Sequence, residues 1–183
     1  YIFLPFFLIA IEPDLGSASV VLMLGFGVLF LVGVQWRIWA VLIAGFLAAS
    51  TLLYEVGLKD YQKQRVEDFL AEKPSYHVQQ SIIAIGSGGF LGKDKEDATQ
   101  VQLKFLPIAT TDFIFAYHVE RFGFFGALVL IFTYALLTLH VLGLRQKFRN
   151  DPFGMVFASG IGVLIFVYSS INIAMTIGLA PVV

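Results

Sequence analysis

The chain has 183 residues; 58% of them are hydrophobic, only 14% are charged, and the formal net charge is −1 at pH 7. Because soluble domains carry about 25% charged residues, this composition excludes an ordinary soluble domain and indicates an integral membrane protein. The balanced charge, without a basic block, argues against nucleic-acid binding, and the absence of cysteine excludes disulfides, thiol catalysis and cysteine-ligated metal sites.

The N-terminal part of the chain predicts one partial and two complete membrane helices. Residues 1–11 are apolar and begin without a Met or a signal peptide, so we expect the chain to be a piece of a longer protein. A break follows at residues 12–16, because proline cannot continue a helix and glycine tolerates strained backbone. Since about 20 apolar residues cross a bilayer, we expect spans over residues 15–34 and 38–56.

The central segment, residues 57–104, holds most of the charge, with seven basic and seven acidic side chains. Apolar side chains between Leu58 and Leu70 fall on one half of a helical wheel, which is typical of a helix that lies in the membrane interface. The apolar run from Ile82 to Ile85 is too short to cross a bilayer and leads into Gly-Ser-Gly-Gly. We therefore expect a re-entrant or surface segment there.

The C-terminal part predicts two further spans, over residues 122–144 and 153–179. Asp151-Pro152 precedes the last span, and proline is tolerated in the first turn of a helix. Small residues recur at four-residue spacing in this span, which predicts a face for close helix packing: Gly154, Ala158 and Gly162.

The expected topology follows from the short loops. Basic residues in such loops mark the cytoplasmic side, and residues 145–149 carry three basic groups and no acid. We therefore expect residues 57–115 to face outward, together with Pro181 and the break at residues 12–16.

The sequence predicts an all-α polytopic membrane protein with a single transmembrane domain over residues 1–183. It would contain about four full transmembrane helices, a partial N-terminal one, and a long extracytoplasmic loop with interfacial or re-entrant helices that leads to the candidate active site.

One carboxylate, Asp112, stands just inside an apolar run. An ionisable group at the edge of a membrane span indicates a functional site. Two interpretations are open. Thr111 could cap the following helix while Asp112 complements the positive end of its dipole, or Asp112 could act as a general base at the helix mouth. The two roles are compatible.

The other polar residues have simpler interpretations. Glu12 and Asp14 suit a capped turn, with Asp14 at the N-cap of the next helix. Lys93 could meet a phosphate, although loop lysines are usually only solvated. The Gly-Ser-Gly-Gly segment resembles a phosphate-binding loop weakly, because neither a strand nor a Gly-Lys-Ser/Thr pattern accompanies it. Glu120-Arg121 suits an ion pair or an interfacial anchor.

A series of motifs, taken in order, resembles the SEDS family (shape, elongation, division and sporulation) of the RodA/FtsW/SpoVE type. The resemblance covers nearly all of the chain. The motifs are Glu-Pro-Asp-Leu-Gly-Ser-Ala (12–18), Asp60-Tyr61-Gln62-x-Gln64-Arg65, Tyr76-His77-x-x-Gln80-Ser81, Ile83-Ala84-Ile85-Gly86-Ser87-Gly88-Gly89, Gly92-Lys93, Thr99-Gln100, Phe105-Leu106-Pro107, Thr111-Asp112-Phe113-Ile114-Phe115, Phe122-Gly123 and Asn172-Ile173-x-Met175-x-x-Gly178-Leu179-x-Pro181-Val182.

The resemblance implies a protein of about ten transmembrane helices, of which this chain would be the middle and later part. It implies a peptidoglycan glycosyltransferase that polymerises lipid II at the outer face of the bacterial cytoplasmic membrane. The implied partners are a class B penicillin-binding protein and the cell-elongation or division machinery, with no nucleic acid. Asp112 occupies the place of the family's essential aspartate and would be the general base.

The implied chemistry also needs cations for the departing lipid pyrophosphate. Lys93, Arg65 or a divalent cation, Mg or Mn, could supply them, and no organic cofactor is expected. The remaining substrate-binding candidates are Gln80, Ser81, Ser87, Thr111, Glu12 and Asp14.

Three residues near the expected base depart from the family pattern, and each changes the polarity or the charge of its position. Ile108 replaces a glutamate, Thr110 a histidine, and Arg121 a glutamate, which leaves open a member with reduced activity. Two other functions are also open. One is a flippase or transporter of lipid-linked precursors, although almost no polar path crosses the predicted midplane. The other is a non-catalytic scaffold that binds a partner's membrane helix through the small-residue faces.

Overall fold

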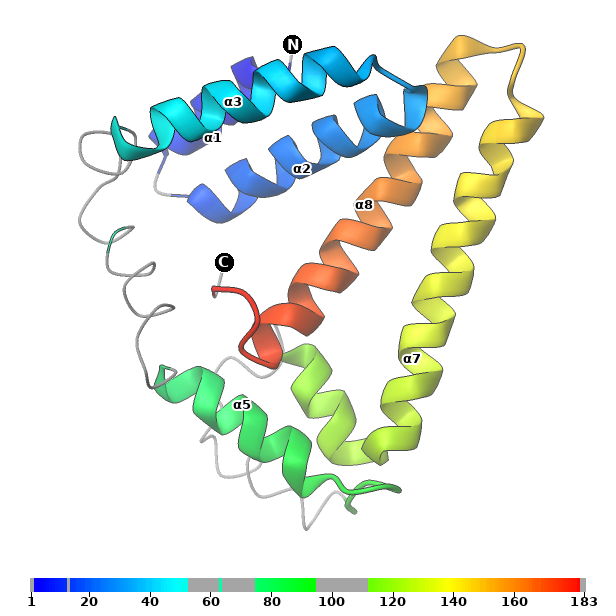
Figure 1. Cartoon of the computed structure of the whole chain (residues 1–183). Coiled ribbons are helices and arrows are strands. Elements are labelled where there is room, and N and C mark those ends of the chain that lie inside the picture. Colours follow the sequence, from blue (N-terminus) through cyan, green and yellow to red (C-terminus); the bar gives the residue numbers. More distant parts are fainter. Residues whose placement is uncertain (1, 13, 53–62, 64–74, 95–111, 182–183) are drawn as a thin grey trace.

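The computed structural model describes residues 2–12, 14–52, 63, 75–94 and 112–181. Every element in this part of the chain is a helix, as predicted (Figure 1). The helices are α1 (Phe3–Ile11), α2 (Leu15–Val32), α3 (Trp36–Leu52), α5 (Tyr76–Ser87), α7 (Ile114–Lys147) and α8 (Pro152–Thr176). The predicted interfacial helix between Leu58 and Leu70, with the candidate Arg65, lies outside the described residues, and so do Ile108, Thr110 and Thr111.

Two helices, α7 and α8, are long and apolar enough to cross a membrane, with mean hydropathies of 2.2 and 1.9 over their best windows. The shorter helices α2 and α3 are also apolar, over the stretches Gly16–Val32 and Trp36–Gly45 respectively. Each of the four predicted spans thus corresponds to a helix. Although α7 begins at Ile114, its backbone breaks at Gly123, so the predicted span over residues 122–144 corresponds to the part of α7 after the break.

The helix ends follow local chemistry. The Asp14 carboxylate accepts a hydrogen bond from the Ser17 amide at 2.9 Å and caps α2, and Gly33 ends this helix in the left-handed conformation, with φ 89°. The Asp151 carboxylate accepts a hydrogen bond from the Phe153 amide at 3.1 Å and caps α8. The predicted cap at Asp14 and the predicted helix start at Asp151-Pro152 are therefore confirmed.

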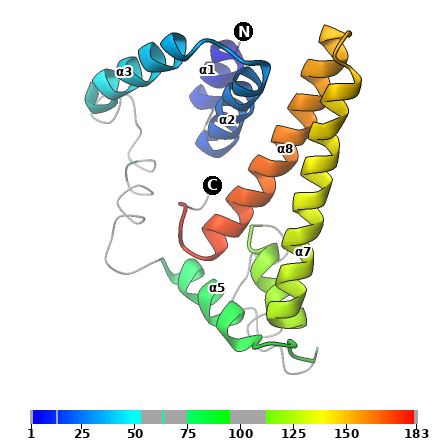
Figure 2. The same cartoon turned by 45° about the vertical axis from the view of Figure 1, so that its right-hand side comes forward.

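Three helices, α2, α5 and α7, contact α8, and α1 packs on α2 (Figures 1 and 2). Helix α8 forms an antiparallel hairpin with α7 and also packs against α2, and α5 lies across the first part of α7. The predicted small-residue face is used: Ala158 is buried, and a Cβ atom on Gly162 would overlap the Leu142 side chain of α7. The turn between α7 and α8 and the turn between α2 and α3 lie at one end of the molecule, and α5 lies at the other.

A sharp break at Gly123 divides α7 into a short first section and a long second section. Gly123 has φ 67° and ψ −168°, a backbone conformation that is essentially restricted to glycine. In Figure 1 the first section runs down to this break, and the second section turns back along α8. The sequence analysis did not predict the break.

The segment after α5, residues 88–93, packs against this break and is called the glycine loop below. The Phe124 amide donates a hydrogen bond to the Gly89 carbonyl at 2.8 Å, and the Phe125 amide donates one to the Phe90 carbonyl at 3.2 Å. In the reverse direction, the Lys93 amide donates to the Glu120 carbonyl at 3.0 Å. A helix break leaves such backbone groups without helical partners, so the glycine loop satisfies both sides of the break.

The glycines make this close approach possible. A Cβ atom on Gly88 would collide with the Val119 carbonyl, and one on Gly92 would collide with the Arg121 carbonyl. Gly92 also has a positive φ of 84°. Gly88 of the Gly-Ser-Gly-Gly motif therefore has a structural explanation in backbone packing, which does not require a bound phosphate.

Replacement of Gly123 by alanine should destabilise the protein strongly. The backbone conformation alone costs a non-glycine residue about 1–3 kcal/mol, and the new Cβ would meet the Gly92 amide and the Phe90 carbonyl. Gly143→Ala is the matched control, because Gly143 lies in the same helix with open space around its Cβ position. Thermal unfolding of the full-length protein in detergent should show a clearly lower Tm for Gly123→Ala alone. Equal Tm values would contradict the assigned role.

Candidate functional site

Asp112 lies two residues before α7, next to its N-cap. Phe113 occupies the N-cap position, the place expected for Thr111, and within the part of the chain that the structure describes no side-chain hydrogen bond caps this end of α7. The Asp112 side chain is half-buried. A carboxylate here is close to the amino-terminal end of α7, where backbone amides lack helical partners. The predicted location at a helix mouth is therefore confirmed.

Two contacts fix the main chain at Asp112. The side-chain amide of Asn172 in α8 donates a hydrogen bond to the Asp112 carbonyl at 2.9 Å. The next residue, Phe113, is 1% exposed and packs in a cluster with Val78 and Ala84 of α5. The start of α7 is therefore held from one side by α8 and from the other by α5.

A buried hydrogen bond joins α5 to α8 near the same place. The Ser81 hydroxyl donates to the Thr176 carbonyl at 2.8 Å, and both residues are fully buried. Thr176 is the last residue of α8, where carbonyls lack helical partners. Ser81, predicted as a substrate-binding residue, thus has its hydroxyl engaged in joining two helices.

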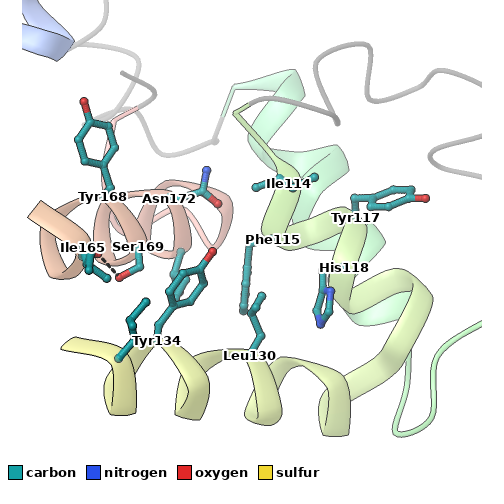
Figure 3. A pocket seen from close by; sticks show the side chains of 12 residues that line it. Ile114, Phe115, Tyr117, His118, Leu130, Tyr134, Ile165, Tyr168, Ser169 and Asn172 are labelled. Carbon is teal, nitrogen blue, oxygen red and sulfur yellow. Dashed lines mark hydrogen bonds between the residues drawn. The ribbon is translucent and has the colours of Figure 1, made fainter. Parts of the chain in front are cut away.

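A cavity of about 560 Å³ lies between α8 and the two sections of α7 (Figure 3). Its walls are mainly apolar, and its polar groups include a histidine, three tyrosines and the amide of Asn172. Asn172 also binds the Asp112 main-chain carbonyl, so one residue of the cavity wall is joined to the main chain of the candidate base. Such a cavity suits a ligand with both apolar and polar parts. The lining residues are Ile114, Phe115, Tyr117, His118, Leu130, Tyr134, Leu137, Ile165, Tyr168, Ser169, Asn172 and Ile173.

Ser87 directly precedes the glycine loop, and Lys93 is its last residue. The Lys93 side chain is half-buried where this loop meets the break in α7. The Ser87 hydroxyl donates to the Ala84 carbonyl of its own helix at 3.0 Å. Gln80 is half-buried next to Ser81 in α5.

The remaining candidates are placed differently. Glu12 and Asp14 are exposed at the connection between α1 and α2, where Asp14 acts as a cap. Arg65 and Thr111 are not among the described residues. The part of the chain that the structure describes contains no group of three or more His, Cys, Asp and Glu side chains that could hold a metal ion, so the divalent cation stays a prediction.

Sequence reasoning missed two polar contacts at this site. Asn172 was recognised only as part of a motif, although an amide in an apolar span signals a hydrogen-bonding partner. His118 spans the break in α7: its Nε2 atom lies 3.2 Å from the Gly126 carbonyl, and its ring lies against that of Phe122. No local pattern indicated the second contact, because it depends on the break itself.

Comparison with known proteins identifies relatives over the whole chain. The sequence profile of the FtsW/RodA/SpoVE family, described as "Cell cycle protein", matches residues 1–183. The chain is 59% identical over 183 residues to the peptidoglycan glycosyltransferase MrdB of Helicobacter pylori, covering 100% of this chain and 48% of the relative.

Two more distant relatives also match all or nearly all of the chain. The chain is 42% identical over 187 residues to the peptidoglycan glycosyltransferase MrdB of Escherichia coli K12, covering 100% of this chain and 50% of the relative. It is 37% identical over 181 residues to the probable peptidoglycan glycosyltransferase FtsW of Neisseria gonorrhoeae, covering 95% and 38%. The chain thus spans about half the length, or less, of the curated relatives it matches.

Removal of the Ser81 hydroxyl should destabilise the contact between α5 and α8. Ser81→Ala leaves the buried Thr176 carbonyl without this donor, which costs about 1–3 kcal/mol. Ser87→Ala is the control, since that hydroxyl bonds only within α5 and its loss should change stability by about 0.5 kcal/mol or less. Thermal unfolding of the full-length protein in detergent measures both. The structural role of Ser81 is wrong if the two variants unfold alike.

Proposed function

The chain belongs to the FtsW/RodA/SpoVE family, and we propose that the protein of which it is part is a peptidoglycan glycosyltransferase that polymerises lipid II. The names of the MrdB relatives, at 59% and 42% identity over the whole chain, support this activity. The observation that carries the proposal is the position of Asp112. Its carboxylate stands half-buried at a helix mouth, beside a mainly apolar cavity with polar groups in its walls.

The proposed reaction is a single displacement. Asp112 removes the proton from the 4-hydroxyl of the acceptor sugar as this oxygen attacks the anomeric carbon of the donor. The bond from that carbon to the lipid pyrophosphate breaks, and the configuration at the carbon is inverted. The position of Asp112 at the mouth of α7 suits this role, because a general base must be held within hydrogen-bonding reach of the hydroxyl proton that it removes.

The departing pyrophosphate requires positive charge. Among the described residues, Lys93 is the candidate nearest to the break in α7, through its backbone contact with Glu120. Arg65 and a divalent cation, Mg or Mn, are further candidates. The cavity would receive an apolar part of the lipid-linked substrate, with sugar or phosphate groups toward Asp112.

The same proposal sets the protein in the bacterial cytoplasmic membrane. The four spans would be α2, α3, α7 and α8, with α1 as part of a fifth. The basic turn at residues 145–149 would face the cytoplasm and α5 would lie at the outer face, which fits their positions at opposite ends of the molecule. A class B penicillin-binding protein and the elongation or division machinery would be its partners.

Replacement of the proposed base should abolish polymerisation. Asp112→Asn keeps the shape of the side chain but cannot accept the proton, so we expect a loss of about 10²- to 10⁴-fold in lipid II polymerisation. Asp151→Asn is the matched control, because asparagine is an equally good N-cap for α8. The assay uses the full-length protein with its partner penicillin-binding protein. Equal glycan synthesis by the parent and Asp112→Asn would refute the assignment, and no synthesis by the parent would refute the enzymatic function.

Loss of the Lys93 charge should slow departure of the pyrophosphate. Lys93→Gln should lower kcat by at least about tenfold, because one charged donor at a transition state commonly contributes that much or more. Lys147→Gln, at the opposite end of α7, should leave kcat unchanged. A chelator arm tests whether a divalent cation supplies part of the charge. Unchanged kcat in Lys93→Gln would assign this role to other groups.

A further inference from the structure

Asn172 makes a contact that joins distant parts of the chain. It lies in the last quarter of α8, and its Nδ2 atom donates a hydrogen bond to the Asp112 carbonyl at 2.9 Å, across a sequence separation of 60 residues. The side chain also lines the cavity between α8 and α7 (Figure 3). Asn172 thus contacts both the candidate base and the space proposed for the substrate.

The N-cap residue of α7 cannot hold the Asp112 segment through a side-chain hydrogen bond. Asp112 precedes the N-cap position, and that position holds Phe113, whose side chain has no hydrogen-bonding atom. Burial of the Phe113 ring against α5 fixes one side of the turn. The Asn172 amide fixes the other side through the main chain of Asp112 itself.

Asn172 is well suited to this task because α8 is held along much of its length. Val163 and Val167 of α8 form a buried cluster with Val20 of α2. The C-terminal end of α8 is joined to α5 by the buried bond between Ser81 and Thr176. A side chain on this helix therefore has a defined position relative to both of its neighbours.

From these contacts we infer that Asn172 is a positioning residue for Asp112. Its amide sets the height and direction of the Asp112 main chain at the end of the cavity, and so the place of the carboxylate. The inference rests on the proposed function, because a general base must meet the acceptor hydroxyl within hydrogen-bonding distance. A misplacement of about 1 Å at a reacting group can reduce the rate about 10²-fold.

The test compares two replacements of Asn172 in the full-length protein. Asn172→Ala removes the amide, and Asn172→Asp keeps its size but replaces the NH₂ donor by a second oxygen. If both variants behave alike, the effect comes from loss of the NH₂ donor and not from loss of packing, because only Asn172→Ala removes side-chain volume. Ser159→Ala is the control, because Ser159 is a buried polar residue of α8 whose hydroxyl donates to the Met155 carbonyl of the same helix.

Two measurements are made on each variant. The first is hydrogen–deuterium exchange of peptides covering residues 112–118, with peptides from α5 and from the second section of α7 as internal references. The second is the rate of lipid II polymerisation, with kcat and KM determined separately. A general loss of folding would speed exchange in every peptide, whereas a local loss of positioning would speed it only at residues 112–118. The value of kcat is therefore referred to the folded fraction of each variant.

We expect exchange at residues 112–118 to become about five- to tenfold faster in both Asn172 variants, as the loss of one hydrogen bond implies, with the reference peptides unchanged. We also expect kcat to fall by at least tenfold while KM stays within about twofold, and no change in Ser159→Ala. Unchanged exchange, or faster exchange with unchanged kcat, would overturn the inference. If the parent makes no glycan strands, the proposed function fails, and the exchange result alone decides whether Asn172 fixes the Asp112 segment.

Discussion

The break in α7 at Gly123 is the constraint on which this end of the molecule depends. A helix break in an apolar environment exposes backbone amides and carbonyls that must find partners, and the glycine loop provides them through backbone hydrogen bonds with Glu120, Phe124 and Phe125. This pairing fixes α5 against α7. The bond from Ser81 then fixes α5 to α8, and the bond from Asn172 of α8 holds the Asp112 carbonyl just before α7. The location of the candidate base is thus the result of several mutually dependent contacts.

The sequence predicted the helices well because their signals are local. Apolar runs of sufficient length gave the spans, and Asp14 and Asp151 marked the starts of α2 and α8 through capping that depends only on nearby residues. The break in α7 could not be predicted in this way. Gly123 lies between apolar and aromatic residues, where a glycine can also continue a helix, and its positive φ is stabilised by the glycine loop about 30 residues earlier in the chain.

The candidate site was predictable only in part, for the same physical reason. Asp112 could be found because a carboxylate at the edge of an apolar run is unusual and because it belongs to a distinctive motif. The roles of Ser81 and Asn172 depend on partners 95 and 60 residues away, and no spacing rule brings such residues together. Ser81 was therefore assigned to substrate binding, whereas its hydroxyl joins two helices, and Asn172 received no role.

The central claim is that Asp112 meets the acceptor sugar at the end of the cavity between α7 and α8. An experimental structure of the full-length protein with a bound lipid II analogue tests it most directly. The account predicts an Asp112 carboxylate oxygen about 2.6–3.2 Å from the acceptor 4-hydroxyl, with an apolar part of the ligand inside the cavity. A ligand bound with its acceptor hydroxyl beyond the reach of Asp112, even through one water molecule, and with the cavity empty, would contradict the account.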